Sequence, residues 1–312
     1  MVTLSARVVR VRAPNPSPMT LTGTNTYLVR TSPNALLAID PGPDIEAHVD
    51  EILAVAVRMN ADIQTILVTH GHPDHAPAAQ PLSRRTGAPV LAHALAKFPV
   101  DQRLRDGETL PFENATLRIV DAPGHAVDHL VFALQEESAL FTGDVVLGSG
   151  TVVVAPPGGA MRPYQRTLER LLHEHGDANA IYGGHGERVD DPRAKLVEYI
   201  EHRKMREREL LARLQRGPAT IPDLVRAIYA GVDRRLWPAA ARQMLAYLLA
   251  LEEEERVVPE ILEREPTPEE AAILDPNLQR IADPAAAEVA RAELGTATRL
   301  PLVSYRLIPS SL

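Results

Sequence analysis

Apolar residues recur with two different periods along the first 190 residues of the chain. Short apolar runs predict strands, at 26–29, 35–39, 63–68, 116–120, 130–134 and 139–142, with a further short strand within 179–186. Residues 47–59 and 164–175 place apolar side chains on one helical face, as amphipathic helices do. Strands interleaved with helices, some of them in hairpins, predict an α/β layered domain with mixed sheets.

The pattern changes at about residue 192, where longer helical stretches replace the short strands. Residues 195–216 predict one long helix with interspersed charges, and 220–229 and 235–254 predict two more. Three helices of this kind, followed by a strand, indicate a winged-helix-like module. We therefore expect a first domain of residues 1–192 and a smaller, mainly helical domain of residues 193–312.

The wing of this module is expected to be interrupted. A short strand is predicted over 255–258, and a second apolar run at 302–308 predicts its partner. Between them lies an acidic stretch rich in Ala and Pro, near 260–300, which we interpret as an insertion.

Composition narrows the chemistry that the chain can carry out. The 312 residues include no cysteine, which excludes disulfides, thiolate catalysis and Cys-ligated metals. A net charge of −8 gives no overall basic surface for nucleic acid. No apolar run approaches the length that crosses a bilayer, so we expect no membrane partner. We expect a cytoplasmic protein, or one of an organellar matrix if the source is eukaryotic, and leave a homodimer open.

Histidine and aspartate residues gather just beyond the apolar strands, in loops beside Gly or Pro. These candidate ligands are His70, His72, Asp74 and His75 in VTHGHPDH, then His125, Asp144 and His185. Imidazole nitrogens and carboxylate oxygens suit zinc and its neighbours in the first transition row. Because so many ligands exceed the four of one tetrahedral ion, we predict two divalent metal ions. Zn²⁺ is the favoured metal, with Mn²⁺ or Fe²⁺ as alternatives.

The motif THGHPDH, followed by PGH, TGD and GGHG at these intervals, resembles the metallo-β-lactamase superfamily of dinuclear hydrolases. The resemblance covers roughly residues 1–200 and implies an αββα sandwich with the site at one edge. It also implies ligands for two metals: His70, His72 and His125 for the first, Asp74, His75 and His185 for the second, and Asp144 bridging both.

A narrower resemblance extends into the second domain. The segments NPSPMTLTGTNTYLV, APGHAVDHL, FTGDVVLGSGT and VEYIEHR are similar to the lactamase-beta-2-like group, which carries a C-terminal winged-helix-like module. Animal members of that group act as endoribonucleases on single-stranded RNA, while many bacterial members are assigned only as hydrolases. This chain departs from the group at Ala126, where threonine is common, and in the extra segment near 260–300.

These observations predict metal-assisted hydrolysis. A metal can lower the pKa of bound water from 15.7 to about 7, and a hydroxide bridging two metals would attack phosphorus or a carbonyl carbon. Asp74 is the predicted catalytic proton-transfer residue, because it would lie beside that nucleophile. Of the possible activities, the resemblance slightly favours a phosphodiesterase, namely an endoribonuclease that acts on single-stranded RNA. The alternative is a small-molecule thioester, ester or lactone hydrolase, like the hydroxyacylglutathione hydrolases. The complete ligand set opposes a third hypothesis, a nucleic-acid-binding regulator.

Residues close to the predicted ligands leave alternatives open. Asp40 either orients a ligand histidine or forms the turn in DPG. His129 is either near the site, as the resemblance favours, or a buried structural histidine. His173 and His175 are two residues apart on a helix, where they share no face, and are predicted at the surface.

Other segments are assigned structural roles. Tyr164 and the loop 148–151 follow the Asp144 strand and either line the substrate pocket or, as we favour, are structural. The run RKMRER at 203–208 predicts a solvated helix face with internal ion pairs rather than an RNA-binding face. Further basic residues add positive charge to the module without indicating RNA: Arg226, Arg234, Arg235 and Arg242.

Overall fold

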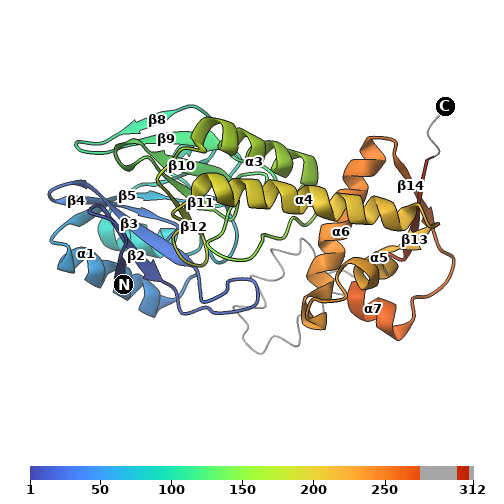
Figure 1. Ribbon diagram of the computed structural model, residues 1–312. Coiled ribbons are helices and arrows are strands. Elements are labelled where there is room, and N and C mark those ends of the chain that lie inside the picture. The colour runs from blue at the N-terminus through green and yellow to red at the C-terminus, as the bar shows by residue number, and fades with distance from the viewer. Residues whose placement is uncertain (275–300, 309–312) are drawn as a thin grey trace.

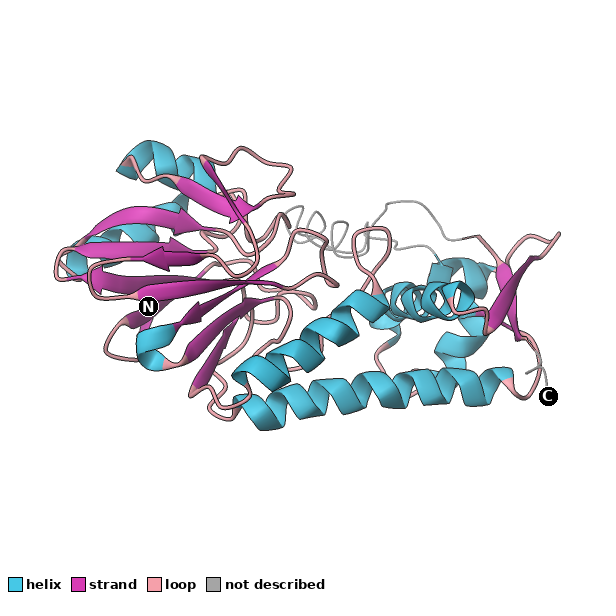
Figure 2. Cartoon of the chain, turned by 90° about the horizontal axis from the view of Figure 1, so that it is seen from above, coloured by secondary structure: helices cyan, strands magenta, loops and turns pink. Residues whose placement is uncertain are grey.

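Two β-sheets lie face to face at one end of the molecule, and helices cover their outer faces (Figure 1). The structure, a computed structural model, describes residues 1–274 and 301–308. Figure 2 shows the strands of the two sheets at one end and a mainly helical part at the other. The four layers form the αββα sandwich that the resemblance implied.

The first sheet has seven strands in the order of the sequence. They are β1 (Val2–Thr3), β2 (Val8–Arg12), β3 (Asn25–Ser32), β4 (Ala35–Ile39), β5 (Asp62–Leu67), β6 (Val90–His93) and β7 (Gln102–Leu104). β3 and β4 form the predicted antiparallel hairpin, whereas β5 runs parallel to both β4 and β6. The sheet is therefore mixed, as expected.

The second sheet has five strands in the order β12-β11-β10-β9-β8. They are β8 (Thr109–Pro111), β9 (Thr116–Asp121), β10 (Leu130–Leu134), β11 (Ala139–Gly143) and β12 (Ala180–Gly183), and a 3₁₀ turn (Gln135–Glu137) joins β10 to β11. Every residue of β4, β10 and β11 is buried, because these strands have protein on both faces. This burial explains why they appear in the sequence as continuous apolar runs rather than alternating ones.

Four helices cover the two sheets. α1 (Glu46–Arg58) and α2 (Ala79–Thr86) pack on the first sheet, and α3 (Met161–His175) and α4 (Pro192–Leu214) lie on the side of the second. One apolar core fills the space between the sheets, and two others lie beneath these helix pairs. α2 begins at Ala79, two residues after Pro77.

The long helix α4 leads from the sandwich into the C-terminal part (Figure 1). This part contains α5 (Ile221–Ile228), a 3₁₀ turn (Arg234–Leu236), α6 (Trp237–Glu253), α7 (Pro268–Leu274) and a sheet of β13 (Ala219–Thr220), β15 (Val303–Leu307) and β14 (Val257–Ile261). β14 and β15 pair antiparallel, with Val257 opposite Leu307, as expected for the predicted wing. Of the insertion predicted near 260–300, the structure describes residues 260–274, which include the end of β14 and all of α7, and residues 275–300 lie outside the described part of the chain.

Ion pairs and apolar contacts hold the C-terminal part against α3. Arg162 of α3 binds Glu207 of α4 and Glu254, the residue that follows α6. The apolar core beneath α3 and α4 continues into α5 and α6. The helical module is therefore packed against the sandwich rather than tethered to it.

The basic run 203–208 is only partly the solvated face that the sequence predicted. Lys204 and Arg206 do form ion pairs one turn away, with Glu201 and Glu209. Arg203, however, is buried, because its position on α4 faces α6 and the loop that follows β11.

Among the described residues, no helix is long and apolar enough to cross a bilayer.

Candidate metal centre

The predicted ligands meet where the loops that follow four strands converge. His70, His72, Asp74 and His75 follow β5, His125 follows β9, Asp144 follows β11 and His185 follows β12. All are buried except His72, which is half-buried. Parallel pairing of β11 with β12 brings the last two of these loops to the same edge. The structure thus gathers every residue that the sequence singled out as a metal ligand.

Nitrogen and oxygen atoms of these side chains form three overlapping groups, each within 4.8 Å. The groups are His70 with His72 and His125, His70 with His75 and Asp144, and Asp74 with His75 and His185. The first and third groups match the two ligand sets implied by the resemblance. Asp144 lies between them, with its carboxylate 3.3 Å from His185 Nε2 and 3.9 Å from His125 Nε2.

Several ligand atoms at the centre have no hydrogen-bond partner among the described residues, although they are buried. These atoms are His70 Nε2, His75 Nε2, Asp74 Oδ1 and Asp144 Oδ1. An unpartnered buried polar atom costs free energy, and here nitrogen and carboxylate lone pairs converge on one small volume. This donor set fits divalent cations of the zinc type.

Asp40 fixes the orientation of two of the histidines. Its carboxylate accepts a hydrogen bond from His75 Nδ1 at 2.8 Å and from the backbone and hydroxyl of Thr69 at 2.7 and 2.8 Å. The Thr69 hydroxyl in turn lies 3.0 Å from His70 Nδ1. Because the Nδ1 atoms carry these protons, the Nε2 atoms are free to bind a metal. Asp40 also has a positive φ of 50°, so it both turns the chain and orients a ligand.

His125 is held by the backbone of the segment 152–154. Its Nδ1 donates to the carbonyl of Val153 at 2.9 Å, and its Nε2 faces His72 Nδ1 at 3.0 Å. The C-terminal module binds the neighbouring residues of that segment, because Arg203 donates to the Val152 carbonyl at 2.7 Å and Gln243 accepts from the Val154 amide at 3.0 Å. The position of His125 is therefore linked to α4 and α6.

Asp74 is positioned by the loop that precedes β3. The Thr24 hydroxyl donates to Asp74 Oδ2 at 2.9 Å, and Asn15 binds both the hydroxyl and the backbone amide of Thr24. These contacts occupy one oxygen of the carboxylate and leave Oδ1 without a partner among the described residues.

His129 lies beside the centre, as the resemblance favoured. Its ring stacks on that of His70, with 4.6 Å between centroids. Its Nε2 accepts a hydrogen bond from the backbone amide of Asp144 at 3.0 Å. His129 thus supports the loop that carries Asp144.

The charges of the centre balance each other. Burial lowers the pKa of His70 well below 6.5, and neighbouring imidazoles add to this shift. Burial also acts to lower the pKa of His75 and His185, but Asp74 and Asp144 outweigh it and raise the pKa of His185 to about 10. The two histidines in turn hold the pKa of both carboxyls below the usual range despite burial. Both carboxylates are therefore ionised at neutral pH, as binding of a cation requires.

The structure corrects the structural role favoured for the loop 148–151 and the surface position predicted for His175. Residues 149–151 of the loop 148–151 line a pocket that opens beside Asp144, although a structural role was favoured. Tyr164 is structural, because it is buried in α3 and donates to the Val145 carbonyl at 2.7 Å. His173 is exposed as predicted, whereas His175 is half-buried at the end of α3.

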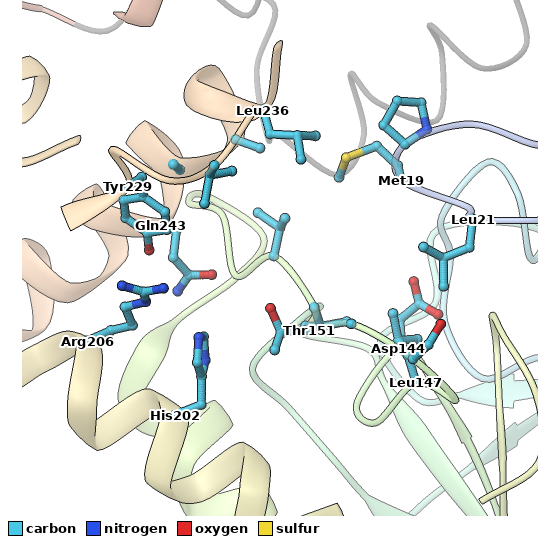
Figure 3. Close-up of a pocket in the computed structure, with 18 of the residues that line it drawn as sticks. Met19, Leu21, Asp144, Leu147, Thr151, His202, Arg206, Tyr229, Leu236 and Gln243 are labelled. Carbon is cyan, nitrogen blue, oxygen red and sulfur yellow. The ribbon is translucent and has the colours of Figure 1, made fainter. Parts of the chain in front are cut away.

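A cavity of about 230 Å³ extends from Asp144 to the C-terminal module (Figure 3). Met19 and Leu21 lie on one side of it, and Leu147, Val152 and Leu236 contribute further apolar surface. Polar side chains of α4 and α6 lie at the end remote from Asp144. The cavity is therefore bounded by both parts of the molecule.

Comparisons with known proteins agree with this geometry. Residues 19–185 match the Metallo-beta-lactamase superfamily, and residues 220–261 match the Beta-lactamase associated winged helix domain. The chain is 32% identical over 271 residues to the Beta-lactamase-like protein 2 homolog of Drosophila melanogaster, covering 80% of this chain and 89% of that protein. It is 36% identical over 240 residues to the Atrochrysone carboxyl ACP thioesterase of Aspergillus chevalieri, covering 73% and 75%.

Among solved structures, a metallo-beta-lactamase family protein from Thermus thermophilus superposes with a TM-score of 0.69 at 25% identity. The match covers 83% of this chain and 97% of that one. The chain belongs to the metallo-β-lactamase superfamily and is a hydrolase of that fold, with a buried His/Asp metal-binding cluster and a C-terminal winged-helix region.

Replacing Asp40 by asparagine should weaken metal binding by about 10- to 100-fold, as loss of a partner behind a metal ligand does elsewhere. An amide nitrogen facing His75 would force the proton from Nδ1 to Nε2, the atom that faces the centre. Competition with a chelator measures the affinity. Asp44, an exposed acid in the same loop, is the matched control as Asp44→Asn. Equal affinities in the two variants would show that Asp40 serves only the turn.

Proposed function

We propose that the protein is a metal-dependent thioesterase acting on small acyl thioesters. The observation that carries this proposal is the cavity between Asp144 and the helical module, which has apolar walls and a volume of about 230 Å³. Pockets for drug-sized ligands are usually larger, at roughly 300–1,000 Å³, so this one suits a single compact acyl group. A thioester carbonyl beside Asp144 would place its acyl group in this cavity.

The ligand atoms fit two cations, held by His70, His72 and His125 on one side and by Asp74, His75 and His185 on the other, with Asp144 between them. Bound metals supply Lewis acidity and activate water at neutral pH. Asp74 Oδ1, buried and unpartnered among the described residues, is the atom that we assign to proton transfer. The other oxygen, Oδ2, accepts from the Thr24 hydroxyl and lies 3.3 Å from His75 Nε2 and 3.2 Å from His185 Nε2, so Oδ1 is the oxygen that these contacts leave available.

Two further observations support a thioester rather than RNA. A relative of 36% identity is named as a thioesterase of an acyl carrier protein. In addition, several arginines of the helical module are paired with acids instead of forming a free basic surface. Arg226 binds Asp223, and Arg235 binds Asp233. Cleavage of single-stranded RNA remains the prediction of the narrower resemblance, and the same experiment measures it.

The test is a parallel assay of metal-loaded protein on acyl thioesters, oxygen esters, lactones and a labelled single-stranded RNA. The double variant His72→Ala, Asp74→Ala is assayed beside it. We expect thioester hydrolysis that is lost in the double variant, with metal quantification showing fewer ions per chain. If the unaltered protein cleaves RNA but hydrolyses no thioester, and the double variant cleaves neither, the protein is a nuclease and the thioesterase proposal is wrong. RNA cleavage that persists in the double variant would indicate a contaminating nuclease.

A further inference from the structure

The end of the cavity remote from Asp144 is built by the helical module. His202 and Arg206 reach it from α4, and Gln243 reaches it from α6 (Figure 3). These polar groups lie beyond the apolar walls and away from the predicted metal ligands. They are therefore placed to contact the far end of an acyl group, not its scissile carbonyl.

Gln243 lines this end of the cavity, and its side-chain amide carries two hydrogen-bond donors. The residue is only 5% exposed. Its Oε1 accepts from the Val154 amide at 3.0 Å and from Arg203 at 3.3 Å, which fixes the orientation of the amide group. Its Nε2 is buried with no hydrogen-bond partner among the described residues. A buried donor without a partner is costly, so this position favours a ligand with an acceptor oxygen.

Arg203 adds a positive charge that no acid of the described part of the chain neutralises. Only 2% of this residue is exposed. Its guanidinium contacts neutral groups, namely the Gln243 oxygen, the Val152 carbonyl and the ring of Tyr164. Within residues 1–274 and 301–308, no carboxylate lies within ion-pair distance of it. Because a buried charge is stable only when it is compensated, an anion in the cavity is favoured.

Arg206 and His202 complete the polar end. Arg206 binds Glu209 at 2.8 Å and lies over the ring of Tyr229, so its own charge is largely balanced. Burial and the two arginines lower the pKa of His202 to about 4, which keeps its ring neutral at pH 7. Glu198, another acid near His202, is paired with Lys195, so the two guanidinium groups and the Glu209 carboxylate leave a single net positive charge. The polar end therefore matches one anionic group.

We propose that this end of the cavity is a carboxylate-binding subsite, formed by Gln243, Arg203 and Arg206, that selects acyl thioesters with a carboxylate at the far end of the acyl chain. The inference rests on the proposed thioesterase function and specifies its substrate class. The apolar walls contact the methylene chain between the two carbonyl groups.

The first experiment compares matched thioesters of N-acetylcysteamine. Hexanoyl and adipyl thioesters share their chain length and differ in the terminal carboxylate, and glutaryl to suberyl thioesters vary the length. At the best length we expect kcat/KM to be at least about tenfold higher with the carboxylate than without it, as one charge-assisted hydrogen bond provides. The gain should appear mainly in KM.

The decisive variant is Gln243→Glu. It retains the oxygen that accepts from Val154 and Arg203, and it replaces the donor nitrogen by a charged oxygen that repels a carboxylate. The ratio of kcat/KM for adipyl over hexanoyl thioester should fall at least about tenfold, a comparison that cancels effects common to both substrates. The melting temperature should rise, because Arg203 gains a counter-ion. Gln64→Glu, on the exposed face of β5, is the matched control.

Arg206→Gln decides the question if Gln243→Glu fails to fold, since it leaves the contacts of Gln243 intact and should lower the same ratio. Thioester hydrolysis with a wild-type ratio near one, or with a ratio that neither variant changes, overturns the subsite but not the thioesterase. RNA cleavage that is lost in Gln243→Glu, together with equal kcat/KM for all the thioesters, contradicts the carboxylate subsite. It would indicate that this end of the cavity binds a phosphate instead. Absence of any thioester turnover contradicts the proposed function itself.

Discussion

Replacing Asp144 by asparagine should remove nearly all hydrolysis, lowering kcat/KM by about a thousandfold or more. The carboxylate lies 3.4 Å from His75 Nε2, 3.3 Å from His185 Nε2 and 3.9 Å from His125 Nε2, so it contacts both groups of predicted ligands. Its charge is needed to bind cations at both positions. Loss of metal-assisted stabilisation costs several kcal/mol in the transition state, and each ~1.4 kcal/mol is tenfold in rate.

Elemental analysis of the purified variant gives a second measure of this effect. We expect the metal content to fall from two ions per chain to one or fewer. Asp177→Asn is the control, because the Asp177 side chain is 91% exposed and binds only at the surface, to Arg193. An Asp144→Asn protein that keeps both metals and full turnover would rule out a bridging role.

Replacing Gly184 by alanine should be nearly as damaging, although it removes no ligand. A Cβ at this position would lie 2.6 Å from His75 Cε1 and closer still to Asp144 Oδ1. Both side chains would have to move, and displacement of reacting groups by about 1 Å can cost a hundredfold in rate. We expect a loss of kcat/KM of about a hundredfold together with weaker metal binding in chelator competition.

Gly158→Ala is the matched control for this substitution. A Cβ at Gly158 would meet no atom of the described residues within 4 Å, and its φ is not in the left-handed region. Its activity and metal content should equal those of the unaltered protein. Wild-type turnover in Gly184→Ala would mean that the centre is wider than the geometry shows.

The sequence predicted the ligands because their positions follow a simple rule. His70, His125, Asp144 and His185 each lie within about four residues of the end of a strand, and these strand ends meet at one edge of the sandwich. The same apolar runs predicted most of the strands of the two sheets. Residue type and spacing were therefore sufficient for this part of the site.

The residues that hold the ligands could not be found in this way. Val153 acts through its carbonyl, which any residue possesses, so no side chain signals its contact with His125. Thr24 lies fifty positions before Asp74 in the chain, and only the packing of its loop brings the hydroxyl to the carboxylate. Arg203 belongs to a charged run whose composition indicates solvent, and its burial depends on how α4 packs against α6.

The side chain of Gln243 has two roles, one for its oxygen and one for its nitrogen. Its oxygen holds the segment that supports His125, while its nitrogen is buried beside the cavity with no hydrogen-bond partner among the described residues. Substitutions at this position that change substrate preference are therefore restricted to side chains with an acceptor oxygen at the same distance from the backbone, namely glutamine and glutamate. Changes in specificity should accumulate more freely at Arg206, whose hydrogen bonds go to Glu209 and to the Ile228 carbonyl rather than to that segment.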